Sequence, residues 1–264
     1  MKYSIDPQLI GSLLKKADLH WQAGQASQAE QCCQQVLAIW PGQPDALHIL
    51  GLIAHAYGRL DQAISLLKQA IMSPRAPASY LSNLAEMYRL KGNLAEAELY
   101  ARQAVVIEPN LAAAHSNLGI ILQEAGKWDE SLKALRVSLQ LNPESAQIYN
   151  NLANTCVLQG RLEDAIGYYQ KALEMFPDYT EGYSNAAVAN FRLGRVEEAF
   201  SLLQQALDQD PSFVPAYGNR VDFYLAQSNI PAAQQTLLMM EGFAPNHPLT
   251  QQCRSKLQFI DSVA

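Results

Sequence analysis

Small and apolar residues recur along this chain at intervals of 34 residues. One column of mostly small residues contains Ala17, Gly51, Ala85, Gly119, Ala153, Ala187 and Val221. A second contains Ala29, Ala63, Ala97, Ser131, Ala165, Ala199 and Ala233. Glycine falls between them at 24, 58, 92, 126, 160 and 194, Ser228 takes the next place, and prolines follow at 41, 74, 109, 143, 177, 211 and 245. Several columns in one register indicate an array of internal repeats.

The columns predict two antiparallel helices in each repeat. Helices that cross closely need a small residue on each side of the crossing, and the two small-residue columns provide them. The glycine between the columns can adopt the left-handed conformation that ends the first helix at little cost. Proline ends the second helix because it lacks an N–H and clashes with the preceding turn.

A 34-residue period with two helices per unit is that of the tetratricopeptide repeat, and the sequence resembles this family over residues 10–247. The resemblance implies an all-α fold, a right-handed α-solenoid of about seven repeats. The predicted units are 10–43, 44–77, 78–111, 112–145, 146–179, 180–213 and 214–247. Residues 1–9 form a lead-in, where Asp6 and Pro7 favour a helix start.

The segment 248–264 is predicted to form a C-terminal capping helix. Leu249, Cys253, Leu257 and Ile260 recur there at helical spacing, and a stack of repeats needs its last apolar face covered. The alternatives are the beginning of another repeat or a junction to a further domain.

Composition and charge limit the kinds of partner molecule that we expect this chain to bind. The net charge of −6 and pI of about 5.4, with no run of Lys and Arg, argue against a nucleic-acid partner. No stretch has the roughly 18–20 apolar residues that span a membrane, and the first residues lack a secretory signal pattern. The four cysteines have no metal-binding spacing. We therefore expect a cytoplasmic protein with reduced cysteines.

A column of asparagines carries the prediction of function. Its members are Asn83, Asn117, Asn151, Asn185 and Asn219. The family resemblance implies that the first helix of each repeat lines a concave groove, so these amides would form a ladder along it. An amide offers two donors and an acceptor, which suits an extended peptide backbone. Two interpretations remain open and do not exclude each other: contact with a peptide, and hydrogen bonding within the array.

Other side chains are expected to reach the same groove. They are Glu86, Arg89, Gln123, Asn154 and Phe191, a mixed set with no dominant charge. The family's chaperone-binding members use a carboxylate clamp that needs lysine directly before the asparagine column. That column reads Leu14, His48, Ser82, Ser116, Asn150, Ser184 and Gly218, so chaperone tails are not the expected ligand.

Catalytic motifs are missing from the sequence. It has no phosphate-binding loop, nucleophile elbow or dinucleotide turn. His48 and His55 lie seven residues apart on one predicted helix, but a metal site needs at least a third ligand. We expect no enzyme activity, no cofactor and no bound metal.

A narrower resemblance comes from the stretch PDALHILGLIAHAYGRLDQAISLLKQAI and from LAAAHSNLG and QIYNNLA. These are similar to the N-terminal arrays of O-GlcNAc-transferase-like proteins and to arrays fused to bacterial sulfotransferases and methyltransferases. In the transferase family the matching asparagines contact the substrate backbone, while no catalytic domain follows Ala264 in this sequence. The resemblance implies recruitment of a substrate protein, without catalysis.

The sequence as a whole predicts a non-catalytic scaffold or adaptor that binds a protein or peptide in its groove. The first alternative is a self-assembling structural protein, a homo-oligomer formed through its terminal units. The second is a substrate-recruiting array of a glycosyltransferase-like protein.

Overall fold

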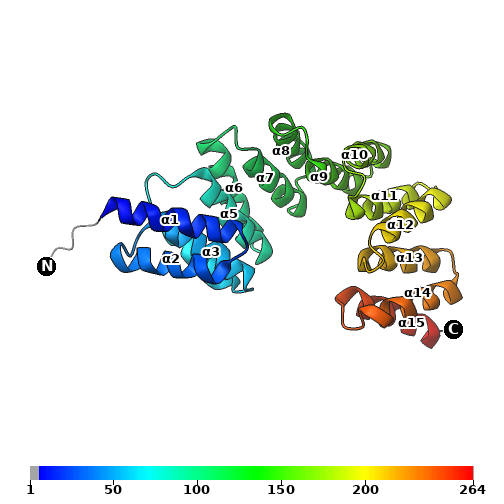
Figure 1. Ribbon diagram of the computed structural model, residues 1–264. Helices are drawn as coiled ribbons and strands as arrows, with labels where there is room; N and C mark the ends of the chain where they lie inside the picture. The colour runs from blue at the N-terminus through cyan, green and yellow to red at the C-terminus, as the bar shows by residue number, and fades with distance from the viewer. Residues whose placement is uncertain (1–5, 264) are drawn as a thin grey trace. The chain divides into compact units, whose positions relative to one another are not determined.

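The computed structural model describes residues 6–263, which form fifteen α-helices and contain no strand (Figure 1). The chain divides into two compact units, with the boundary between Asn142 and Pro143. The all-α prediction is confirmed.

The first unit contains four helix pairs. Their helices are α1 (Pro7–Gln22), α2 (Ala26–Ile39), α3 (Pro44–Ala56), α4 (Leu60–Ala70), α5 (Ala78–Leu90), α6 (Leu94–Ile107), α7 (Ala112–Glu124) and α8 (Trp128–Leu141). The odd-numbered helix of a pair is called helix A below, and the even-numbered one helix B.

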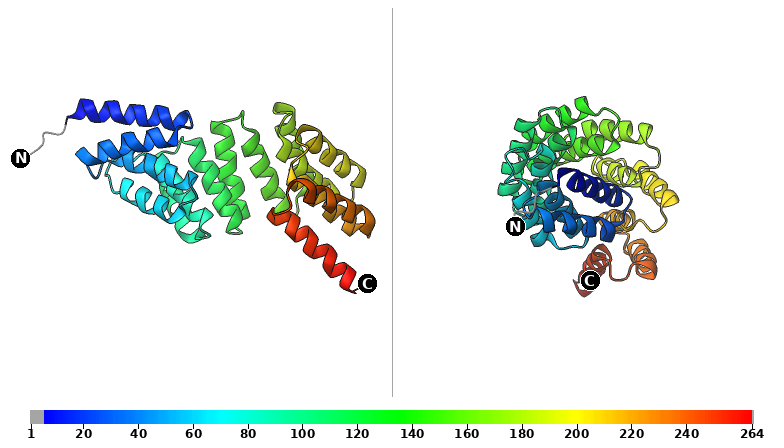
Figure 2. Two further views of the ribbon diagram at one scale, coloured as in Figure 1. Left: turned by 60° about the horizontal axis from the view of Figure 1, so that its bottom comes forward. Right: turned by 60° about the vertical axis from the view of Figure 1, so that its left-hand side comes forward.

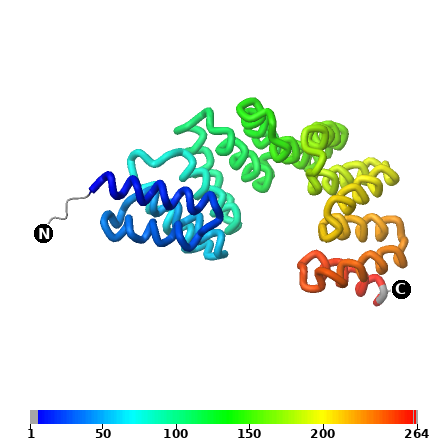
Figure 3. Tube along the Cα trace, viewed as in Figure 1, coloured from blue at the N-terminus to red at the C-terminus, as the bar shows by residue number. Residues whose placement is uncertain are grey.

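The second unit contains three helix pairs and a terminal helix. Its helices are α9 (Ala146–Leu158), α10 (Leu162–Met175), α11 (Thr180–Arg192), α12 (Val196–Gln209), α13 (Val214–Ala226), α14 (Ile230–Phe243) and α15 (Pro248–Val263). Within each unit, helix A packs antiparallel to its own helix B, and each pair packs on the next along the chain (Figures 2 and 3).

Both ends of the helices follow from local sequence. The Asp6 carboxylate accepts hydrogen bonds from the backbone N–H groups of Gln8 and Leu9, at 2.9 and 3.3 Å, and so caps α1 as predicted. Six B helices end two residues before a proline, whereas α4 ends at Ala70, four residues before Pro74.

The turn after each helix A has a left-handed backbone. The six glycines of the turn column have φ between 71° and 79°. Ser228 occupies the seventh turn with a φ of 58°. The last helix pair therefore keeps the left-handed turn, although the Cβ of the serine gives this conformation a steric cost that glycine does not have.

The two small-residue columns form the crossings of helices A and B. Every member of the second column, from Ala29 to Ala233, is 0 % exposed. A Cβ added at Gly119 would lie 2.5 Å from Cγ of Leu135, so the bare backbone of α7 is what lets the leucine of α8 approach. Ser131 replaces alanine there and donates from Oγ to the carbonyl of Gly119 at 2.7 Å.

The terminal helix α15 packs against α13 and α14. It buries Cys253 and Leu257 in the same apolar cluster as Val221 and Met240. Over residues 6–263, no helix combines the length and apolar character needed to cross a membrane.

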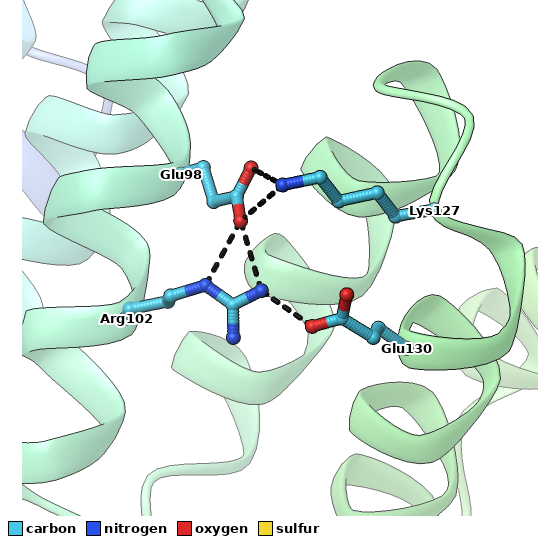
Figure 4. A network of polar contacts seen from close by, with 4 residues as sticks. All are labelled: Glu98, Arg102, Lys127 and Glu130. Atoms are coloured by element: carbon cyan, nitrogen blue, oxygen red, sulfur yellow. Dashed lines mark hydrogen bonds and ion pairs between the residues drawn. The ribbon is translucent and has the colours of Figure 1, made fainter.

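Charged side chains join successive B helices in the first unit (Figure 4). Glu98 on α6 accepts from Lys127 and Arg102, both at 2.8 Å, and Arg102 reaches Glu130 on α8 at 2.5 Å. Burial raises the pKa of Glu98, but its two cationic partners outweigh this and hold the pKa below its ordinary value. Exposed pairs of this kind are worth about 0–1 kcal/mol each, so the network supplements the apolar crossings.

Candidate functional site

The five asparagines lie on five successive A helices, from α5 to α13, and Asn151 is the most buried of them. Four of them donate from Nδ2 to the side chain 35 residues earlier, which is the residue before the asparagine position on the preceding helix A. The pairs are Asn83–His48 at 2.8 Å, Asn117–Ser82 at 2.9 Å, Asn185–Asn150 at 3.0 Å and Asn219–Ser184 at 2.9 Å. The asparagines therefore join neighbouring repeats within each unit.

These acceptors were not predicted as functional residues. The sequence does contain a signal for them, because the column directly before the asparagines consists mostly of short polar side chains. His48, Ser82, Asn150 and Ser184 are the members that accept a hydrogen bond from the next repeat.

His48 accepts in its neutral form. The amide nitrogen of Asn83 has no lone pair, so it donates and Nε2 of His48 accepts, which leaves the proton on Nδ1. The His48 ring stacks on Tyr80 with centroids 3.8 Å apart, and the Tyr80 hydroxyl donates to Asp45. Burial lowers the pKa of His48 to about 4, against the opposing effect of Asp45. At neutral pH the ring is an uncharged acceptor.

The pattern of inter-repeat hydrogen bonds is interrupted at Asn151, in the first helix of the second unit. Its Oδ1 accepts from Gln147 at 3.4 Å. Its Nδ2 is buried and has no hydrogen-bond partner among residues 6–263, and the same is true of Nδ2 of Asn150. Two adjacent amides on α9 thus retain unused donors, which is unusual for buried polar groups.

Glu86 and Arg89 form a fixed ionic pair. Arg89 donates from Nε and Nη2 to the two carboxylate oxygens of Glu86, both at 2.7 Å, and Nη1 contacts Glu124 on α7. Hydrogen bonding to Glu86 raises the pKa of Arg89, outweighing burial. The two side chains predicted to line the groove therefore link α5 to α7.

The other residues that were predicted to line the groove differ in their contacts. Asn154 accepts at Oδ1 from the buried Tyr169 hydroxyl at 2.5 Å. Phe191 stacks on Phe223 with centroids 4.0 Å apart and joins the apolar cluster of the second unit. Gln123 is half-buried on α7.

On the A-helix side, one of the asparagines borders a cavity. A small cavity of about 100 Å³ lies between α13 and α15, and Asn219, Gly218 and Leu249 are among its lining residues. Lys256 of α15 pairs with Asp222 of α13 across it at 2.6 Å. In the described part of the chain, no three His, Cys, Asp or Glu side chains come together as metal ligands.

Family models described as tetratricopeptide repeat match this chain. One matches residues 20–87 and 190–257, together more than half of the sequence, and others match 78–107, 110–178 and 165–212. The chain belongs to the tetratricopeptide repeat family. A comparison with curated protein sequences gives no significant match.

Solved structures share the fold at low sequence identity. A tetratricopeptide repeat protein from Parabacteroides merdae is 17% identical, with 95% of this chain and 99% of that chain covered and a TM-score of 0.77. The type IV pilus biogenesis factor PilW is 21% identical, with 78% and 96% covered and a TM-score of 0.71. The Cut9–Hcn1 hetero-tetramer of the APC/C gives 16% identity, 97% and 49% coverage and a TM-score of 0.72.

Proposed function

We propose that this chain is a non-catalytic scaffold that binds a peptide or protein segment along its A helices. The proposal rests on which hydrogen-bonding groups of the asparagine amides are already used and which are free. One N–H of Asn83, Asn117, Asn185 and Asn219 already donates to the preceding repeat. Each of these half-buried amides keeps a carbonyl oxygen and a second N–H that engage no described residue.

Inter-repeat bonding and peptide contact are compatible in this arrangement. The first bond fixes the orientation of the amide, so little side-chain entropy remains to be lost when a ligand binds. The free oxygen can accept from a peptide N–H, and the free N–H can donate to a peptide carbonyl. Each such bond is worth about 0.5–1.5 kcal/mol net, so several would contribute useful affinity with little dependence on peptide sequence.

The neighbouring charges set the selectivity of this face. Arg89 pairs with both Glu86 and Glu124, and Lys256 pairs with Asp222. With these cations and anions already paired, backbone recognition contributes more than charge attraction. We place Gln123 and Asn154 at the periphery of the binding face, and Phe191 beneath it as a packing residue.

Selection from a random peptide library displayed on phage tests the proposal. The whole chain is the bait, and a recovered peptide is synthesised and titrated against the chain by fluorescence anisotropy. We expect saturable binding by extended peptides of varied sequence. Failure to enrich any peptide above the level of an unrelated helical bait would contradict the proposal.

A further inference from the structure

The B-helix side of the second unit carries a large open cavity. It lies between α10, α11 and α12, which are labelled in Figure 1, and has a volume of about 530 Å³. Ile166, Leu173 and Leu202 supply its apolar lining. The corresponding space in the first unit, between α2, α3 and α4, has only about 140 Å³.

One residue of α11, Ala186, explains why this cavity is the larger of the two. Stepping by 34 residues, Ala186 aligns with Leu50, Leu84, Leu118 and Leu152, and Asn190 aligns with His20, Ala54, Tyr88, Leu122, Cys156 and Tyr224. In the smaller cavity Leu50 is present beside Ala54 and fills part of the space. The repeat 78–111 has Leu84 and Tyr88 at these two positions, and α11 lacks both of these large side chains.

An aromatic ring occupies this place in two other repeats. Tyr88 stacks on Tyr100 with centroids 5.6 Å apart, and Tyr224 packs on Phe200 at 4.8 Å. The residues that align with Tyr100 and Phe200 are Leu202 and Ile166, and both line the cavity. The cavity therefore has apolar walls where two other repeats hold a tyrosine ring.

The cavity also has unused polar groups. Asn190 is 7% exposed, and its Nδ2 donates to the carbonyl of Ala186 at 2.9 Å. Its Oδ1 accepts no hydrogen bond from the residues that the structure describes. This leaves an acceptor at the wall of the cavity.

Charged residues of both signs line the cavity without being paired. In the preceding repeat Arg161 and Asp164 form an ion pair at 2.6 Å. The equivalent residues, Arg195 and Glu198, form no ion pair within residues 6–263, and both line the cavity. Each can take an opposite charge from a ligand.

We propose that this cavity binds the ring of a tyrosine or tryptophan side chain from a protein partner. The ring packs between Ile166 and Leu202, where a tyrosine of the repeat itself would lie, and its O–H or N–H donates to Oδ1 of Asn190. Arg195 and Glu198 contact charged residues that flank the ring in the partner. This site lies on the B-helix side and is independent of the asparagine face.

Methyl spectra of the whole chain test the proposal. The methyl signals of Ile166, Leu173 and Leu202 are followed while N-acetyl-tyrosinamide, N-acetyl-phenylalaninamide or N-acetyl-leucinamide is added. We expect saturable shifts with the tyrosine amide at a Kd at least about fivefold lower than with the leucine amide. Asn190→Ala should remove the advantage of tyrosine over phenylalanine, because only tyrosine donates to Oδ1.

A filled variant provides the control. Ala186→Leu combined with Asn190→Tyr restores the residues of other repeats, and it should abolish the shifts while raising the thermal midpoint. His55→Gln, at an exposed residue of α3 in the first unit, should leave them unchanged. Absence of saturable shifts in the wild type, equal affinity for the leucine amide, or binding retained by the filled variant would each overturn the proposal.

Discussion

At the scale of single residues, the asparagine column has one role that the structure shows, joining repeats, and one that we propose, contact with a peptide. The inter-repeat hydrogen bonds explain why a mediocre helix former recurs on the A helices. They also leave half of each amide available, on which the proposed peptide contact depends. The proposed contact with a peptide is therefore compatible with the observed bonds between repeats.

The first prediction concerns the His48–Asn83 bond. The folded-state pKa of His48 is about 4, below the value of about 6.5 in an unfolded chain. The unfolded state therefore binds more protons between these values, and stability falls as the pH drops from about 6.5 to about 4. His48→Gln should reduce that loss by about 1–3 kcal/mol. Denaturant unfolding at pH 7.5 and 4.5 measures it.

The exposed His55 on the same helix provides the control for this experiment. His55→Gln removes an imidazole without removing the inter-repeat acceptor. The wild-type loss of stability should persist in this variant. An identical loss in His48→Gln would show that His48 is not the titrating group.

A second residue-scale prediction concerns Ser228, whose φ is 58°. Glycine accepts this conformation without the clash of a Cβ, so Ser228→Gly should raise the free energy of unfolding by about 0.5–1 kcal/mol. Gly194→Ser makes the reverse change in the preceding turn, where φ is 79°, and should lower it by a similar amount. Equal thermal midpoints for the two variants would contradict the turn assignment.

At the scale of helix pairs, close crossing requires small residues. Gly119→Ala places a Cβ against Leu135, and overpacking of this kind costs about 1–3 kcal/mol. Gly167, within α10, has nothing within 4 Å of the added Cβ. Gly167→Ala should instead stabilise the protein by up to about 1 kcal/mol, because alanine is the better helix former. Calorimetric midpoints that move in the same direction would contradict this account.

Sequence analysis predicts the helix pairs well because their determinants are local columns. The 34-residue register alone predicts the turn at Ser228. The same spacing predicts the burial of the small-residue column that begins at Ala29 and ends at Ala233. The polar column of acceptors can be read from the sequence, but its pairing with the asparagines cannot, because each pair joins residues 35 positions apart on different helices. The packing role of Phe191 was missed because its partner, Phe223, lies in the next repeat.

At the scale of the whole molecule, the 34-residue period continues across the boundary between the two compact units. Periodicity therefore predicts the repeats but gives no signal for the division at Asn142 and Pro143. Each unit carries its own set of asparagine contacts, two in the first and two in the second. Binding can be tested in both units with variants of the full chain.

The most direct test compares the two partners of the same hydrogen bonds. Asn117 and Asn219 donate to Ser82 and Ser184 at 2.9 Å. Asn117→Ala with Asn219→Ala, and Ser82→Ala with Ser184→Ala, remove the same two inter-repeat bonds at a similar cost of about 1 kcal/mol each. Only the asparagine variant also removes the groups proposed to contact a peptide.

The measurement is the Kd of the library-selected peptide for both double variants, with folding checked by circular dichroism. We predict that the asparagine variant binds about thirtyfold more weakly than the wild type, the equivalent of two hydrogen bonds at about 1 kcal/mol each. The serine variant loses only the fixed orientation of the amides, so it should bind more tightly than the asparagine variant. Equal affinities of the two folded variants would show that the asparagines only join the repeats.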